Sequence, residues 1–208
     1  MDHEAGEPDV AEQAPLRCRN VALRIMSDQL SIFFPLLQRG VRVQAEVGKP
    51  LGQFLSDQLG IPKEYVTGRI TTIFMDNRPV DDLERSRIHE GSRVTLSAAM
   101  PGLVGATMRR SGFYAALRQG ISHAEQGAEL PSGQGTLTLK LFNLLLPELA
   151  PLILARGILL EQDELDALLN EFDAASRLGV ASSYLCDREE CGGTLVTVTV
   201  RDLPATPG

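Results

Sequence analysis

The stretch Val41-Arg-Val-Gln-Ala-Glu-Val47, followed closely by Pro50-Leu-Gly-Gln-Phe-Leu-Ser-Asp-Gln-Leu-Gly60, decides the fold of the first half of this chain. In residues 41–47 apolar side chains alternate with polar ones, as in a strand with one buried face. From Leu51 onward the apolar residues recur at helical spacing, with Pro50 suited to a first turn and Gly60 to the position just past the end. The sequence therefore predicts a strand followed by one short amphipathic helix.

Further strands are predicted on both sides of this pair. Residues 30–37 are predicted to pair with residues 41–47 in a hairpin around Arg39-Gly40. The turn Asp76-Asn-Arg-Pro79 closes a β-branched run, because Asn tolerates a positive φ and Pro fixes φ. One helix over a small mixed sheet is the expected architecture. The other strands expected in this half are residues 18–29, where the pattern leans only slightly toward a strand, residues 70–75 and residues 93–98.

The second half reads as a separate, small α+β unit. A glycine-rich stretch over residues 106–135 predicts a linker. Residues 136–142 alternate as a strand, and residues 143–155 are so apolar that they must be buried, as a helix bent by proline. Residues 161–178 predict an amphipathic helix with acids in its first turn. A closing hairpin of residues 180–186 and 194–201 completes the unit, and no internal repeat of useful length is visible.

Composition excludes several classes of protein. The 208 residues include 43% hydrophobic residues and have a mean hydropathy of -0.03, as in a soluble globular chain of two small domains. No apolar run is long enough for a bilayer span. Residues 1–16 carry five acids and no Lys or Arg, which predicts a disordered tail and argues against a secretory signal. Three cysteines do not make a disulfide framework, so we expect a cytoplasmic protein.

The charges are divided unevenly along the chain. Residues 17–110 carry 14 Lys and Arg against nine Asp and Glu, whereas residues 111–208 carry six against 13. Ordinary surface variation explains this, and docking of the basic segment on an acidic partner is the sharper alternative. Nucleic acid is the less favoured partner, because the Arg residues are dispersed and Trp is absent.

The first half resembles the ubiquitin-like β-grasp family, and within it the sulfur carriers that include the molybdopterin-synthase small subunit and the thiamine sulfur carrier. The resemblance covers about residues 30–105 and rests on three segments. These are the helix of residues 50–60, the strand and turn Ile73-Phe-Met-Asp-Asn-Arg-Pro-Val80, and Ile88-His-Glu-Gly-Ser-Arg-Val-Thr-Leu96 before a Pro-Gly. It implies an α+β chain with an N-terminal β-grasp domain, residues 17–105, whose mixed sheet is covered by one helix. The small α+β domain, residues 136–208, follows the linker.

The resemblance implies sulfur transfer only if the chain is cut. Family members end at Gly-Gly, which is converted to a thiocarboxylate, whereas here Gly102 and Gly105 are not adjacent and about 100 residues follow. The chain is therefore expected to be a docking module or accessory subunit for a partner enzyme. The alternative is a sulfur-carrier precursor that is cleaved near Gly102 to Gly105.

No complete catalytic, cofactor or metal site is predicted. Cys186 and Cys191 flank the predicted turn of the closing hairpin, where they are expected as free thiols, with a reversible disulfide or a metal site as alternatives. A further alternative is an unrecognised enzyme with a polar pocket at the domain junction, containing His89 or His123. A homo-oligomer is also compatible with the apolar run of residues 143–160.

Overall fold

The computed structural model describes residues 19–100, 102–110, 112–114, 132–177, 185–189 and 195–202. Its strands are β1 (Arg19–Ile25), β2 (Val41–Val47), β3 (Thr72–Met75), β4 (Arg78–Pro79), β5 (Arg93–Ser97), β6 (Gly133–Phe142), β7 (Ile158–Glu161), β8 (Leu185–Glu189) and β9 (Leu195–Asp202). Its helices are η1 (Ser27–Phe33, a 3-10 helix), α1 (Phe34–Arg39), α2 (Leu51–Gln53), η2 (Phe54–Gln58, a π-helix), α3 (Lys63–Gly68), α4 (Gly102–Met108), α5 (Leu145–Arg156) and α6 (Gln162–Arg177). None of the described helices is long and apolar enough to cross a bilayer.

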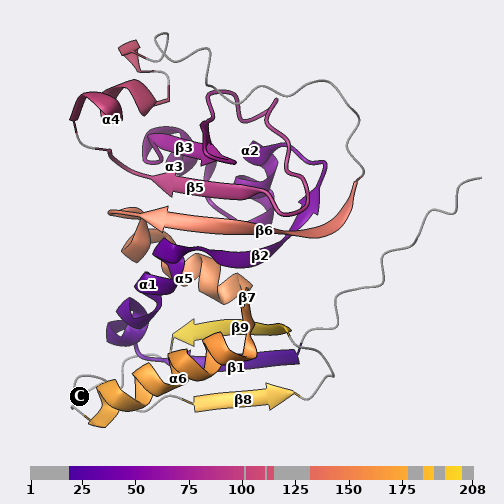
Figure 1. Cartoon of the computed structure of the whole chain (residues 1–208), viewed down its shortest axis with the longest axis vertical. Helices are drawn as coiled ribbons and strands as arrows, with labels where there is room; N and C mark the ends of the chain where they lie inside the picture. The colour runs from indigo at the N-terminus through magenta and orange to yellow at the C-terminus, as the bar shows by residue number, and fades with distance from the viewer. Residues whose placement is uncertain are drawn as a thin grey trace, which may run out of the picture.

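The strands of the described residues form one mixed sheet, and with the helices they make a chain of the α+β class. The strand order is β4-β3-β5-β6-β2-β7-β9-β1-β8. Figure 1 shows the strands stacked from β3 at the top to β8 at the bottom, with α6 lying across the lower strands. The pairs β5–β6 and β1–β9 are parallel, and every other pair is antiparallel.

Most buried side chains of the strands lie on one face of this sheet, although Leu159 of β7 and Thr72 of β3 are buried on the other. Val43 and its register partner Leu137, for example, are no more than 2% exposed. Helix α5 packs at β6 and β9, α1 packs at β6, and α6 packs at β7 and β9. The opposite face of β6 carries partly exposed polar residues, among them Thr138 and Lys140. The alternation in the sequence therefore reports which face of each strand is covered.

The two halves of the sheet repeat the same pattern of strand pairing. Outward from β2 and from β7, the strand pairs repeat the same directions: antiparallel, parallel, antiparallel. The pair Arg42–Leu159 joins β2 to β7 at the centre, and each residue lies two positions after a glycine, Gly40 or Gly157. Counted from these glycines, the rows of paired residues match: Val41–Leu139–Val94–Met75 in one half and Ile158–Val198–Val21–Arg188 in the other.

The two glycines have the same backbone conformation. Gly40 ends α1 with φ 116° and ψ 131°, and Gly157 ends α5 with φ 112° and ψ 139°. A Cβ on Gly40 would lie 2.9 Å from Thr138 Cγ2, and a Cβ on Gly157 would lie 3.3 Å from Thr197 Cγ2. Each glycine thus lets a helix turn into a strand while its backbone passes close to the neighbouring strand.

The predicted hairpin of residues 30–37 and 41–47 is wrong. Residues 27–39 form η1 and α1 instead of a strand. Pro35 lies in the first turn of α1, where its missing N–H costs no hydrogen bond. The backbone N–H of Met26 donates to Gln29 Oε1 at 2.8 Å, which fixes the entry to the helical segment. The helix predicted after Pro50 is confirmed as α2 and η2, although α3 adds a second helical segment beside it.

The closing hairpin is also wrong, because β1 lies between β8 and β9. Val21, Leu23 and Ile25 of β1 are at most 1% exposed, and β1 is buried by a neighbour on each side. The slight preference for a strand over residues 18–29 is confirmed for residues 19–25. The helices predicted at residues 143–155 and 161–178 are confirmed as α5 and α6.

Strand β6 lies between β5 and β2, so the predicted boundaries at residues 105 and 136 do not interrupt the sheet. Residues 133–139 of β6 pair with β2, and residues 138–142 pair with β5. Without β6, the backbone groups of β2 and β5 that face it would lack their partners.

Candidate functional site

The residues predicted from the sequence as possible sites lie apart. Gly102 begins α4 with φ +77°, and Gly105 is buried within the same helix. A Cβ on Gly105 would lie 1.9 Å from the carbonyl oxygen of Met100, so this position requires glycine. Cleavage at Gly102 or Gly105 stays a prediction. Cys186 lies in β8, and Cys191 lies outside the described residues.

His89 lies at the turn beside β5, and its Nε2 is 3.1 Å from Asp76 Oδ2. Asp76 Oδ1 also accepts a hydrogen bond from the backbone N–H of Arg93 at 2.8 Å, which ties the β3–β4 turn to β5. His123 lies outside the described residues. Among the described residues, no three His, Cys, Asp or Glu side chains are grouped to hold a metal ion.

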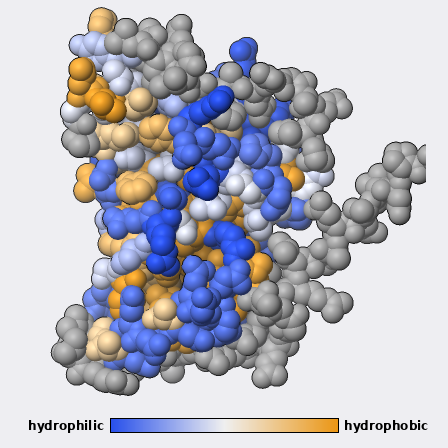
Figure 2. Space-filling model, in the orientation of Figure 1, coloured by the Kyte–Doolittle hydropathy of each residue, from blue (hydrophilic) through white to orange (hydrophobic). Residues whose placement is uncertain are grey.

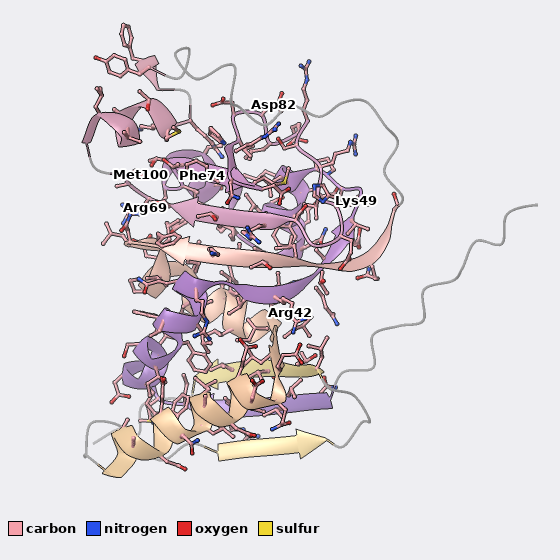
Figure 3. All side chains as sticks on the ribbon, in the orientation of Figure 1. Arg42, Lys49, Arg69, Phe74, Asp82 and Met100 are labelled. Carbon is pink, nitrogen blue, oxygen red and sulfur yellow. The ribbon has the colours of Figure 1, made fainter. Side chains whose placement is uncertain are left out.

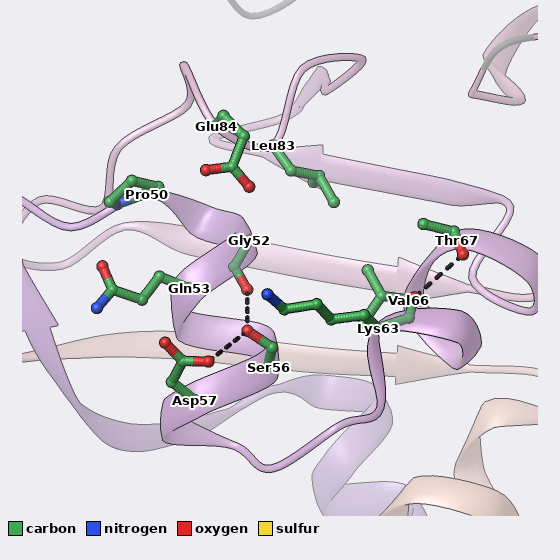
Figure 4. Close-up of a pocket in the computed structure, with 10 residues that line it drawn as sticks. All are labelled: Pro50, Gly52, Gln53, Ser56, Asp57, Lys63, Val66, Thr67, Leu83 and Glu84. Carbon is green, nitrogen blue, oxygen red and sulfur yellow. Dashed lines mark hydrogen bonds between the residues drawn. The ribbon is translucent and has the colours of Figure 1, made fainter.

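A pocket of about 340 Å³ lies between α2–η2, α3 and the loop of residues 81–86, and we call it the α2–α3 pocket. Figure 4 shows that side chains from all three elements converge on it. Its volume lies within the range of small-ligand sites. It is lined by Pro50, Gly52, Gln53, Ser56, Asp57, Lys63, Val66, Thr67, Leu83 and Glu84.

Backbone contacts bring the three walls of the α2–α3 pocket together. The N–H groups of Leu51 and Gly52, at the start of α2, donate to the carbonyl oxygens of Ser86 at 2.7 Å and Leu83 at 3.0 Å. A Cβ on Gly52 would lie 2.7 Å from Glu84 Oε1 and 3.4 Å from Leu83 Cβ, so a larger residue here would displace the Glu84 side chain from the pocket wall. The π-turn of η2 follows, and such turns are frequent at functional sites.

Polar groups of three kinds face this pocket. The Ser56 hydroxyl lies 3.0 Å from the carbonyl oxygen of Gly52 and 2.8 Å from Asp57 Oδ1. In Figure 4 the side chain of Lys63 extends across the pocket toward Gly52 and Ser56. The pocket therefore combines an ammonium group, carboxylates and a hydroxyl with the apolar surface of Val66.

A second surface is formed by apolar residues at the end where the parallel strands β5 and β6 finish. We call it the apolar end, and it consists of Leu103, Val104, Phe113, Phe142 and Leu144. Their exposed fractions run from 37% for Phe142 to 92% for Phe113. Figure 2 shows apolar residues along this edge of the molecule, where α4 and the tip of β6 lie in Figure 1.

Two anchors hold the parts of the apolar end together. Asn143, between Phe142 and Leu144, adopts φ 57° and donates from Nδ2 to Ser97 Oγ at 3.1 Å and to the carbonyl oxygen of Ala99. Arg110, after α4, donates from its backbone N–H to the carbonyl oxygen of Thr71 at 2.8 Å. Burial lowers the pKa of the Arg110 guanidinium, and the nearby Asp81 carboxylate opposes this shift.

A charged network borders the apolar end at Leu144. Arg69, which follows α3, donates to both carboxylate oxygens of Glu148 on α5, and the Tyr65 hydroxyl donates to the same carboxylate. These hydrogen bonds, first that from Arg69, lower the pKa of Glu148 to about 2. Burial, followed by the bond to Glu148, raises the pKa of Tyr65 to about 12. Figure 3 shows Arg69 and Met100 at this end of the molecule.

The sequence did not identify either surface. The helix of residues 50–60 was predicted, but the packing of residues 83–84 against it was not, because no local pattern signals that contact. The sequence places the apolar residues of α4 at the end of the predicted β-grasp domain and in the predicted linker. The one available signal for an exposed surface was that no neighbouring amphipathic stretch offers these residues a face to pack against. Comparison with protein-family models, curated proteins and solved structures finds no match for this chain.

Proposed function

We propose that this chain is a protein-docking module whose apolar end receives an acidic, partly apolar segment of a partner protein. The observation that carries the proposal is that the exposed large apolar side chains of the described residues lie in or just after α4 and at the end of β6, which share one edge of the molecule (Figures 1 and 2). The other large apolar side chains of the described residues are mostly buried. Exposed apolar patches on soluble proteins mark interaction sites. The two aromatic rings of Phe113 and Tyr114, 5.1 Å apart, add the type of side chain that dominates interface energetics.

The charges around the apolar end favour an acidic partner. Residues 98–114 and 132–147 contain Arg109, Arg110 and Lys140 and no Asp or Glu, although Asp81 lies close enough to Arg110 to offset part of this positive charge. The next acid along the chain, Glu148, is ion-paired with Arg69. Complementary charge accelerates association and fixes orientation. Salt should therefore slow binding, while the apolar contacts retain part of the affinity.

The scaffold of this module is inferred to be a β-grasp unit in which the chain order is changed. The sequence assigned residues 30–37 as the antiparallel neighbour of β2, and β6 has that position instead. Strand β6 also runs parallel to β5, while α2 and η2 follow β2 as the covering helix. Docking by such a unit needs no catalytic residue, as the family resemblance implied.

The proposal is tested by comparing partner capture by the wild-type chain, the double variant Leu103→Asp/Leu144→Asp and the control Asn170→Asp. Asn170 is exposed on α6, which packs at β7 and β9, so the control adds a negative charge at a site distant from the apolar end. We expect a partner that the wild type and the control retain and the double variant loses. The purified partner should then bind the double variant at least about tenfold more weakly, because buried apolar anchors carry most interface energy.

Salt dependence supplies the second readout. Replacing Lys140 with Glu should slow association with the purified partner and reduce the effect of salt on that rate. If every retained protein binds the double variant as tightly as the wild type, the apolar end is not a docking surface and the proposal fails.

A further inference from the structure

The α2–α3 pocket contains charged groups that form no hydrogen bond or ion pair with the rest of the described chain. Among the residues that the structure describes, neither the Lys63 ammonium nor the Glu84 carboxylate has a hydrogen-bond or ion-pair partner. Both groups line the same pocket, yet they are not within ion-pair distance of each other. This arrangement is independent of the apolar end and of the docking proposal.

The positions of these groups define a pattern for a ligand. In Figure 4 the Lys63 side chain lies in the middle of the pocket, with Glu84 on one side and Asp57 on the other. Val66 is buried beneath them, and Pro50 and Leu83 are partly buried. A ligand that fills the space therefore meets one positive group, two negative groups and an apolar surface.

We propose that the α2–α3 pocket binds a small zwitterion, an α-amino acid with an aliphatic side chain. Its carboxylate pairs with Lys63, its ammonium group pairs with Glu84, and its side chain covers Val66 and Leu83. A ligand with one charge leaves either the Lys63 ammonium or the Glu84 carboxylate without a partner. A volume of about 340 Å³ accommodates a ligand of this size.

The charges also predict an order of affinity among related ligands. With two carboxylates and one ammonium group in the wall, the pocket has a net negative charge. A singly charged cation should therefore bind more tightly than a singly charged anion of the same shape, and a zwitterion should bind more tightly than either. The three matched probes are L-leucine, 3-methylbutylamine and 4-methylpentanoate.

The test is isothermal titration of the full chain with each probe. We expect L-leucine to bind about fivefold more tightly than the amine, since an exposed ion pair contributes up to about a factor of five, and the acid to bind most weakly. Lys63→Met should remove the advantage of leucine over the amine, and Glu84→Gln should weaken leucine and the amine together. The matched controls, Lys140→Met and Glu171→Gln, should leave all three affinities unchanged.

Each outcome decides the proposal. Preferential binding of leucine that depends on Lys63 and Glu84 supports it. Equal binding of the three probes, leucine binding that survives both variants, or no binding of leucine at millimolar concentration overturns it. Lys63 and Glu84 are exposed, so the variants should unfold at the wild-type temperature, and that measurement separates lost binding from lost structure.

Discussion

Replacing Gly40 with Ala should destabilise the protein by about 2–4 kcal/mol. An L-residue at φ 116° and ψ 131° costs on the order of 1–3 kcal/mol. The added Cβ would also lie 2.9 Å from Thr138 Cγ2 and 3.0 Å from Lys140 Cε, and overpacking of this kind costs roughly 1–3 kcal/mol when the neighbours cannot move. Because the lysine tip is flexible, the steric part should fall at the lower end of that range.

The matched variants make this prediction quantitative. Gly157→Ala has a similar φ, but its nearest contacts are 3.3 Å, so it should cost less than Gly40→Ala. Gly68→Ala is the control, because no atom lies within 4 Å of its Cβ position in α3, and it should be neutral or stabilise by up to about 1 kcal/mol. Thr138→Ser in the Gly40→Ala background should recover only the steric part.

Urea unfolding followed by circular dichroism gives the free energy of unfolding for each variant. A domain is stable by about 5–15 kcal/mol, so the expected loss for Gly40→Ala is a large share of the total. The reasoning is refuted if Gly40→Ala unfolds within about 0.5 kcal/mol of the wild type, or if Gly157→Ala is the more damaging change.

Three other perturbations have defined outcomes. The pKa of Glu148 is about 2 in the folded chain, so its carboxylate stabilises the fold above pH 4.5 and the contribution is lost as pH falls toward 2. The free energy of unfolding of Glu148→Gln should therefore fall less than that of the wild type between pH 4.5 and 2. Equal slopes of unfolding free energy against pH for the two proteins would contradict this. Gly135→Ala should lower the free energy of unfolding in urea by about 1–3 kcal/mol, because its Cβ would lie 2.1 Å from Glu90 Oε2 and break the hydrogen bonds from Thr136 to that carboxylate. Gly133→Ala is the control, because no atom lies within 4 Å of its Cβ position, and it should be the milder change. A fragment of residues 17–105 should give the circular dichroism and the narrow amide NMR dispersion of an unfolded chain, because it lacks β6; a folded fragment would show that the β2–β5 part is independent.

The local patterns of this sequence were sufficient for most individual elements. Alternation identified β2, β5 and β6, and helical spacing identified α2–η2 and α6. The apolar run after Asn143 was expected to be buried, and Leu145, Leu149 and Ile153 are at most 3% exposed. These features follow from which side chains repeat on one face, and a single segment contains that information.

Pairing between segments was decided only by the tertiary structure. An alternating strand shows which face is buried and gives no indication of which strand lies beside it. Strand β6 therefore replaced residues 30–37 as the neighbour of β2, and β1 separated β8 from β9. The repeated pairing pattern of the two halves could not be read from the sequence, because it lies in strand direction and register around Gly40 and Gly157 while the side chains differ. The α2–α3 pocket and the apolar end depend on these long-range contacts, and the sequence alone contained the residues of both surfaces without bringing them together.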